Sequence, residues 1–169
     1  LWVNLPATKK MVPPTYRDIS LTDIPVVADK ATVRILSGCY QGIRGALNGS
    51  HARVTYLDIT LPAGILWSYE EAHNNETLFI YLLEGSLIPD PEQRSIEDKG
   101  CAILYSVSAP GERTHEPVVV KAGAEGARFL LLAASPLREP VAWGGPIVMN
   151  THEELRESFE ELRNGTFIK

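Results

Sequence analysis

The feature that most constrains the fold of this chain is a series of short apolar runs, each closed by a turn residue. Residues 78–83 form an unbroken apolar run of strand length, and a glycine follows closely. Residues 56–61 alternate between apolar and polar side chains until Pro62 ends the run. Turn signals that recur at such intervals are typical of antiparallel sandwiches and barrels. The sequence therefore predicts an all-β fold, with further strands at residues 33–36, 102–105, 117–121 and 128–133.

A hairpin is predicted near the middle of the first half of the chain. Residues 43–47 and 52–57 flank the pair Asn48-Gly49. Both residue types tolerate positive φ, so this pair is the strongest short hairpin signal in the sequence. We expect the two flanking runs to pair across it.

The one clear helix comes last. Thr151 is a good N-cap, and Glu154 three residues later completes a capping box. The apolar residues recur at helical spacing, and Asn164-Gly165 supplies a stop signal. The pattern predicts an amphipathic helix over residues 151–163, with an apolar stripe of Leu155, Phe159 and Leu162.

Composition excludes several classes of protein. The formal net charge is -5 and no block of lysine or arginine stands out, so direct nucleic-acid binding is not expected. The apolar runs are too short to span a bilayer, so no membrane association is expected. Two cysteines, Cys39 and Cys101, make no disulfide framework and favour a reducing, cytoplasmic location.

The ligand inventory is poor. No two of the four histidines share the His-x-His spacing that places two imidazoles on one face of a strand. His73, with Glu76 nearby, and His115 are the only weak metal candidates, and both histidines lie in polar, loop-like stretches. No nucleophile elbow or phosphate-binding loop occurs either. The sequence predicts no catalytic, cofactor-binding or metal-binding residue in this chain.

Several segments, in order along the chain, match one known family: residues 1–6, 56–59, 79–86, 136–141 and 145–151. The last of these segments leads directly into the predicted helix. Together they resemble the pirin family of the cupin superfamily, and the ending at residues 163–169 resembles bacterial members.

This resemblance implies an antiparallel cupin (jelly-roll) β-barrel with a C-terminal helix. Pirins have two such barrels, and the resemblance places this chain in the second. Residues 1–20 are then a linker strand from an N-terminal barrel absent from the chain, residues 21–150 the C-terminal barrel, and residues 151–169 the helix and tail. The abrupt apolar start at Leu1 fits a cut through that linker.

The family resemblance also implies where the chemistry lies. Pirins hold iron through three histidines and one glutamate, all in the first barrel. The intact protein is expected to resemble an iron-dependent quercetin 2,3-dioxygenase and a redox-linked regulator of transcription. Its partners would be regulators or metabolic enzymes. In the second barrel the cupin metal motif has decayed, and here Glu70 and Ala72 stand at the positions of its first two histidines.

Three hypotheses follow. In the first, this chain is a non-catalytic half, inactive alone, that supports the metal barrel and offers interaction surface. Its partner is then the N-terminal barrel, contacted through Trp2 and Leu5, and it binds no cofactor itself. In the second, the chain is a metal-dependent enzyme that uses His73, Glu76 and His115. In the third, it is a stand-alone small-molecule-binding module whose pocket is lined by aromatic residues, namely Trp67, Tyr69, Phe79 and Tyr81.

Overall fold

The computed structural model describes residues 1–47, 49, 51–70, 77–92, 95–105 and 117–168. The chain forms two compact units. Unit 1 comprises Leu1–Asp18, Ser50–Ala52 and Leu137–Lys169, and unit 2 comprises Ile19–Gly49 and Arg53–Pro136. In unit 1 the contacts group residues 137–150 with the C-terminal helix. The predicted boundaries at residues 20 and 150 remain predictions.

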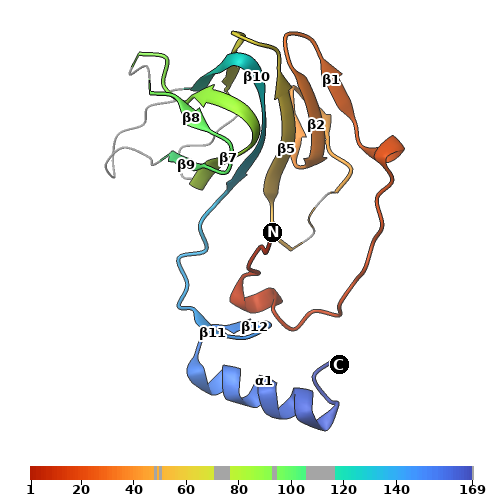
Figure 1. Ribbon diagram of the computed structural model, residues 1–169. Coiled ribbons are helices and arrows are strands. Elements are labelled where there is room, and N and C mark those ends of the chain that lie inside the picture. Colours follow the sequence, from red (N-terminus) through yellow and green to blue (C-terminus); the bar gives the residue numbers. More distant parts are fainter. Residues whose placement is uncertain (48, 50, 71–76, 93–94, 106–116, 169) are drawn as a thin grey trace. The chain divides into compact units, whose positions relative to one another are not determined.

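Unit 2 is an antiparallel β-structure, which confirms the all-β fold class (Figure 1). Its main sheet has the order β1-β2-β5-β10-β7-β8, while β6 also pairs with β10 and β9 with β7. A 3-10 turn at Leu21–Asp23 precedes the sheet. The strands of the sheet are β1 (Val26–Ala28), β2 (Thr32–Ser37), β5 (Val54–Leu61), β6 (Leu66–Tyr69), β7 (Thr77–Ile88), β8 (Glu97–Asp98), β9 (Ala102–Tyr105) and β10 (Val118–Ala134).

The prediction of a barrel needs one correction. Within the described strands, the hydrogen-bonded path runs from β1 to β8 and does not return to β1, so the ring is open. Both end strands are short, and β8 consists of two acidic residues, Glu97 and Asp98. Short, charged edge strands discourage further pairing. The jelly-roll class therefore stands, but the described strands do not close the barrel.

The core lies on one face of the long strands. The predicted stripe on β5 is confirmed, since Leu57, Ile59 and Leu61 are all buried. On β10 the inward positions include Phe129 and Leu131, which are fully buried. Successive residues of a strand point to opposite faces, so the residues between these buried positions lie on the outer face.

Two glycines lie where the antiparallel pairing of β7 and β10 is irregular. The register between these strands shifts between Ala122 and Ala127 and again after Arg128. Gly85 on β7 has φ +73°, and Gly126 on β10 has φ +82°. A Cβ at Gly85 would overlap the carbonyl oxygen of Gly126. The backbones of β7 and β10 can approach this closely because Gly85 has no Cβ, while a Cβ at Gly126 would instead lie 2.7 Å from the Leu61 carbonyl oxygen of β5.

The predicted hairpin at Asn48-Gly49 is wrong. β3 (Cys39–Tyr40) pairs instead with β4 (Ile43–Arg44), while β5 pairs with β2 and β10. The turn between β3 and β4 is formed by Gln41 and Gly42, both with positive φ (49° and 75°). Two such residues define the type I′ turn that fits a tight hairpin. Because β2 and β10 occupy both edges of β5, the run after Gly49 has no free edge for β4.

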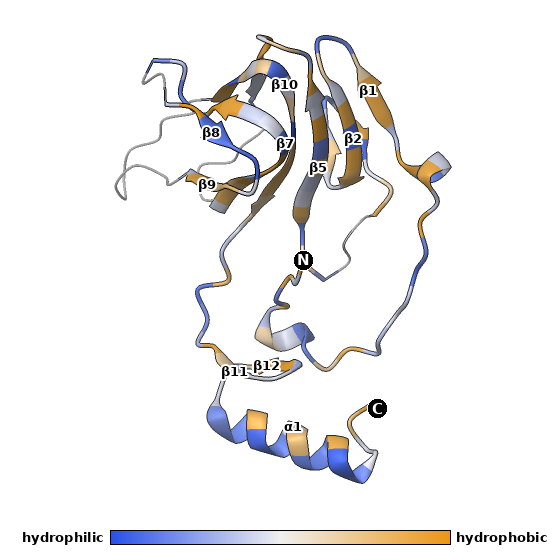
Figure 2. Ribbon diagram, in the orientation of Figure 1, coloured by the Kyte–Doolittle hydropathy of each residue, from blue (hydrophilic) through white to orange (hydrophobic). Residues whose placement is uncertain are grey.

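Unit 1 contains a 3-10 turn (η1, Ala7–Lys9), a short hairpin of β11 (Ala142–Gly144) and β12 (Ile147–Met149), and α1 (His152–Asn164). The predicted helix is confirmed within a residue at each end. Figure 2 shows the apolar residues of α1 gathered on one side of the helix. A Cβ at Gly144 would lie 3.1 Å from the ring of Phe159 and 3.2 Å from Leu155, so α1 packs closely on the hairpin. No helix in the described part of the chain is long and apolar enough to cross a membrane.

The capping box holds the start of α1. The Thr151 hydroxyl accepts a hydrogen bond from the Glu154 amide (3.1 Å), and the Glu154 carboxylate accepts one from the Thr151 amide (2.9 Å). A second backbone amide, that of Asn150, donates to the same carboxylate (3.0 Å). These hydrogen bonds lower the pKa of Glu154. Gly165 ends the helix in the left-handed conformation (φ 71°).

We expect Thr151→Ala to destabilise α1 by about 1 kcal/mol, as is typical for loss of an N-cap side chain. Glu154→Gln should show a pH-dependent deficit relative to the wild type. The folded-state pKa of Glu154 is lowered, so its contribution is complete above the usual glutamate pKa of about 4.3 and is lost as the pH falls through the lower folded value. Thermal melts followed by circular dichroism at pH 7 and at pH 3 test this. A deficit of equal size at both pH values would contradict it.

Candidate functional site

The sequence-predicted metal candidates cannot be placed. His73, Glu76 and His115 lie outside the described residues. Among the residues that the structure does describe, no group of three or more histidine, cysteine, aspartate or glutamate side chains is arranged to hold a metal ion. The described residues thus offer no ligand set for the iron that the family resemblance implies, and we derive no chemical step through a metal in this chain.

The four aromatic residues proposed as a pocket lining do not share one face. Trp67 and Tyr69 are buried in the core, where their rings stack at 6.2 Å. The Trp67 indole also packs edge-on against Phe129 (5.8 Å) and donates a hydrogen bond to the Tyr40 hydroxyl (3.1 Å). Tyr81 alternates with the buried Ile80 and Leu82 and is exposed on the opposite face of β7, as expected for strand periodicity; the same parity places Phe79 there. The structure therefore divides the proposed pocket residues between core and outer face.

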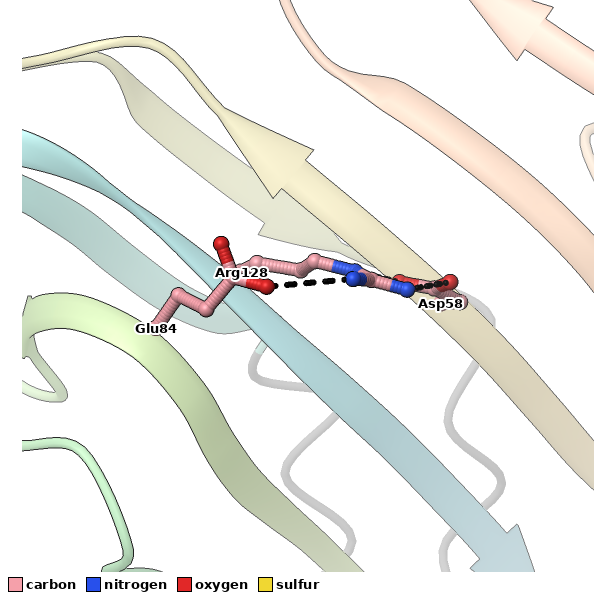
Figure 3. Close-up of polar contacts among 3 residues, drawn as sticks. All are labelled: Asp58, Glu84 and Arg128. Carbon is pink, nitrogen blue, oxygen red and sulfur yellow. Dashed lines mark hydrogen bonds and ion pairs between the residues drawn. The ribbon is translucent and has the colours of Figure 1, made fainter.

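The outer face of unit 2 carries an ion-paired cluster across three strands (Figure 3). Arg128 on β10 makes a two-pronged contact with Asp58 on β5, with Nε–Oδ1 at 3.0 Å and Nη2–Oδ2 at 2.9 Å. Its Nη1 donates to Glu84 on β7 at 3.1 Å. The Asp58 side chain is only 10% exposed, whereas that of Glu84 is 68% exposed. The hydrogen bonds and charge of Asp58, with a smaller part from Glu84, raise the pKa of Arg128.

Unit 1 exposes aromatic surface. The rings of Trp2 and Trp143 meet edge to face with centroids 6.3 Å apart. Each remains more than half exposed, Trp2 at 56% and Trp143 at 68%. Val141, two residues before Trp143, is also exposed. Exposed tryptophans are unusual, and tryptophan is the residue type most enriched at the energetic centres of protein interfaces. Of the two predicted contact residues, Trp2 is thus largely exposed and Leu5 partly buried; their contact with a second barrel stays a prediction.

A polar cluster connects three parts of unit 1 that are distant in the sequence. Glu139 Oε2 accepts hydrogen bonds from the Ala7 backbone amide (2.8 Å) and from the Asn150 side-chain amide (3.1 Å). The same Asn150 amide donates to the Pro140 carbonyl (2.9 Å). Lys10 donates to Asn4 (2.7 Å); burial lowers its pKa, and the charges of Glu139 and Glu154 oppose that shift. We name Asn4, Ala7, Lys10, Glu139, Asn150 and Glu154 the polar cluster.

Neither cysteine forms a disulfide. The Cys101 thiol donates to the Glu97 carboxylate (3.6 Å), and desolvation together with this contact raises its pKa. Cys101 is therefore held as a thiol rather than as the thiolate that a nucleophile requires.

Sequence reasoning missed both Arg128 and the polar cluster. One signal was available for Arg128 and Asp58, since each is a charged residue at an outward position of an alternating strand. Their pairing spans 70 residues, so the sequence alone could not connect them. Glu139 and Asn150 lay within segments that carry the family resemblance, but the partner of Glu139 at Ala7 is 132 residues away.

The antiparallel jelly-roll sheet and the C-terminal helix define a cupin-type domain. More particularly, the chain belongs to the pirin family, because the family model described as the pirin C-terminal cupin domain matches residues 56–168.

Individual relatives agree with this assignment. A pirin-like protein of Caulobacter vibrioides is 34% identical over 99% of this chain and 57% of its own length. Pirin of Mus musculus is 35% identical over 97% of this chain and 54% of its own length. Among solved structures, a quercetin 2,3-dioxygenase from Acinetobacter baumannii superposes with a TM-score of 0.81 at 30% identity, covering 98% of this chain and 55% of the other. The chain thus spans little more than half the length of the relatives it matches.

Proposed function

We propose that this chain serves as the C-terminal, non-catalytic cupin half of a pirin-like protein. In the intact protein it supports an N-terminal, iron-holding barrel and offers surface for protein partners, either regulators or metabolic enzymes. The intact protein then acts as an iron-dependent quercetin 2,3-dioxygenase and redox-linked regulator. The free thiols of Cys39 and Cys101 support a reducing, cytoplasmic location.

The observation that carries the proposal is the exposed Trp2–Trp143 pair of unit 1. Two adjacent tryptophans, each more than half exposed, leave a large apolar area in water. Burial of apolar area stabilises an interface by about 25 cal/mol per Å². The family model is that of a C-terminal domain and the relatives are almost twice as long as the match, so the N-terminal part of such a protein is the partner we assign to this surface.

A chimera tests the proposal. This chain replaces the corresponding segment of the Acinetobacter baumannii quercetin 2,3-dioxygenase, and the readouts are metal content by elemental analysis and quercetin consumption. We expect the chimera to bind metal and consume quercetin, and the isolated chain to do neither. In the chimera, Trp2→Ala and Trp143→Ala should lower its thermal stability, because both remove interface area, while Tyr16→Ala, at an exposed position of unit 1, is the matched control.

Two outcomes would overturn the proposal in different ways. Stoichiometric iron in the isolated chain, with quercetin turnover that His73→Ala abolishes, would instead support the stand-alone metal enzyme built on His73, Glu76 and His115. A tryptophan variant that is no less stable than the Tyr16→Ala control would remove the aromatic pair from the interface.

A further inference from the structure

Two of the segments that carry the family resemblance, and the residue that directly follows a third, meet at the Glu139 carboxylate. Residues 1–6 lead into Ala7, whose amide donates to Glu139. Glu139 itself belongs to residues 136–141, and its second donor, the side chain of Asn150, belongs to residues 145–151. Neither the cupin fold of unit 2 nor the proposed support function accounts for why these three segments carry the resemblance together.

From this convergence we infer that Glu139 is a clasp that fastens the N-terminal segment, residues 1–10, to the hairpin and helix of unit 1. The Glu139 carboxylate is the common acceptor for a backbone donor of the N-terminal segment and a side-chain donor at the end of β12. Hydrogen bonds to an ionised carboxylate are stronger than neutral ones.

The rest of the polar cluster orients the clasp from both sides. On the helix side, Glu154 accepts the backbone amides of Asn150 and Thr151, which fixes the backbone from which the Asn150 side chain reaches Glu139. The Asn150 side chain is further fixed by its second acceptor, the Pro140 carbonyl. On the N-terminal side, Lys10 donates to Asn4, and this hydrogen bond spans the turn that carries Ala7.

The clasp has a consequence for the aromatic pair. Trp2 lies on the N-terminal segment and Trp143 on β11, and their rings are in contact. Each tryptophan is largely exposed, so this one ring contact contributes little to holding the segment in place. Fastening at Ala7 therefore determines whether Trp2 remains beside Trp143. The position of Trp2 beside Trp143 does not depend on the proposed function. Only the assignment of these two tryptophans as the surface for an N-terminal barrel rests on it.

Hydrogen–deuterium exchange on the complete 169-residue chain tests the clasp directly. Glu139→Ala removes both acceptor bonds, and we expect the amide of Ala7 and its neighbours to exchange about tenfold faster or more. Glu139→Gln keeps a side-chain oxygen but loses the charge, so it should give a smaller increase. Glu157→Gln, which neutralises an exposed carboxylate of α1, is the matched control and should change nothing at residues 1–10.

The pattern of exchange separates a clasp from general instability. Faster exchange confined to residues 1–10 in both Glu139 variants, with β5 and β10 as protected as in the wild type, supports the clasp. Unchanged exchange at Ala7 in Glu139→Ala would overturn it, as would equal acceleration throughout unit 1 in the milder Glu139→Gln variant. If the clasp is supported but the chimera described above binds no metal, the proposed function fails while the clasp stands.

Discussion

Gly85→Ala is expected to lower the free energy of unfolding of unit 2 by about 2–5 kcal/mol. The positive φ of Gly85 (+73°) costs an L-residue about 1 kcal/mol or more. In addition, the new methyl group would overlap the carbonyl oxygen of Gly126, which is backbone and cannot rotate away. The two strands would have to separate at the irregularity in their pairing, and overpacking of this kind costs about 1–3 kcal/mol. Chemical denaturation followed by fluorescence of the buried Trp67 measures the change.

Gly100→Ala is the matched control for this prediction. Gly100 also has a positive φ (+87°), but a Cβ there would meet nothing within 4 Å. It therefore carries the conformational cost without the overlap, and we expect a loss of only about 1–2 kcal/mol. Equal losses in the two variants would show that the close approach of Gly85 to Gly126 contributes nothing to stability.

The irregular pairing of β7 and β10 also shows what the sequence could and could not predict. The apolar run at residues 78–83 and its closing glycine predicted a strand and its end, but β7 continues through Gly85 to Ile88. A glycine marks either a turn or a bulge, and only the partner strand distinguishes the two. Here the partner is Gly126, which is distant in sequence, so the periodicity of one strand could not reveal it.

Local signals, in contrast, predicted local structure well. The capping box of Thr151 and Glu154 and the stop at Gly165 fixed both ends of α1, because each depends on residues within one turn of the helix. The Asn48-Gly49 signal failed for the opposite reason. Its turn chemistry was favourable, but the pairing edges of β5 were already occupied by β2 and β10. Competition for a strand edge is a tertiary effect that a dipeptide cannot report.

In the candidate site, too, the sequence could indicate residues but not their distant partners. Trp2 was predicted as a contact residue from the resemblance to the pirin family. Its exposure and its contact with Trp143 were visible only in the structure. Glu139 lies within a segment that carries the resemblance, yet its role depends on a hydrogen bond that it accepts from the Ala7 amide, 132 residues away in the sequence. Residue identity could therefore indicate that the segment mattered, but only the fold could show which atom joins it to the rest of unit 1.

Arg128→Met is expected to lower the free energy of unfolding by about 2–3 kcal/mol. The substitution preserves most of the side-chain length but leaves the Asp58 carboxylate, with a side chain only 10% exposed, without its two-pronged partner. Removing one member of a buried pair costs about 3–5 kcal/mol. We expect less here because the Arg128 side chain is 40% exposed, so water reaches part of the site. Glu84→Gln, at a 68% exposed side chain, should cost less than about 1 kcal/mol.

A double-mutant cycle decides whether the unpaired carboxylate is the cause. Asp58→Leu combined with Arg128→Met removes both charges from the outer face of β5 and β10. Replacing both partners by apolar groups can be nearly neutral, so the double variant should be more stable than Arg128→Met alone. If the two single losses simply add, Arg128 stabilises the sheet through its packing rather than through Asp58. A recovery in the double variant would show that the loss in Arg128→Met comes from the unpaired Asp58 carboxylate, 70 residues away in the sequence.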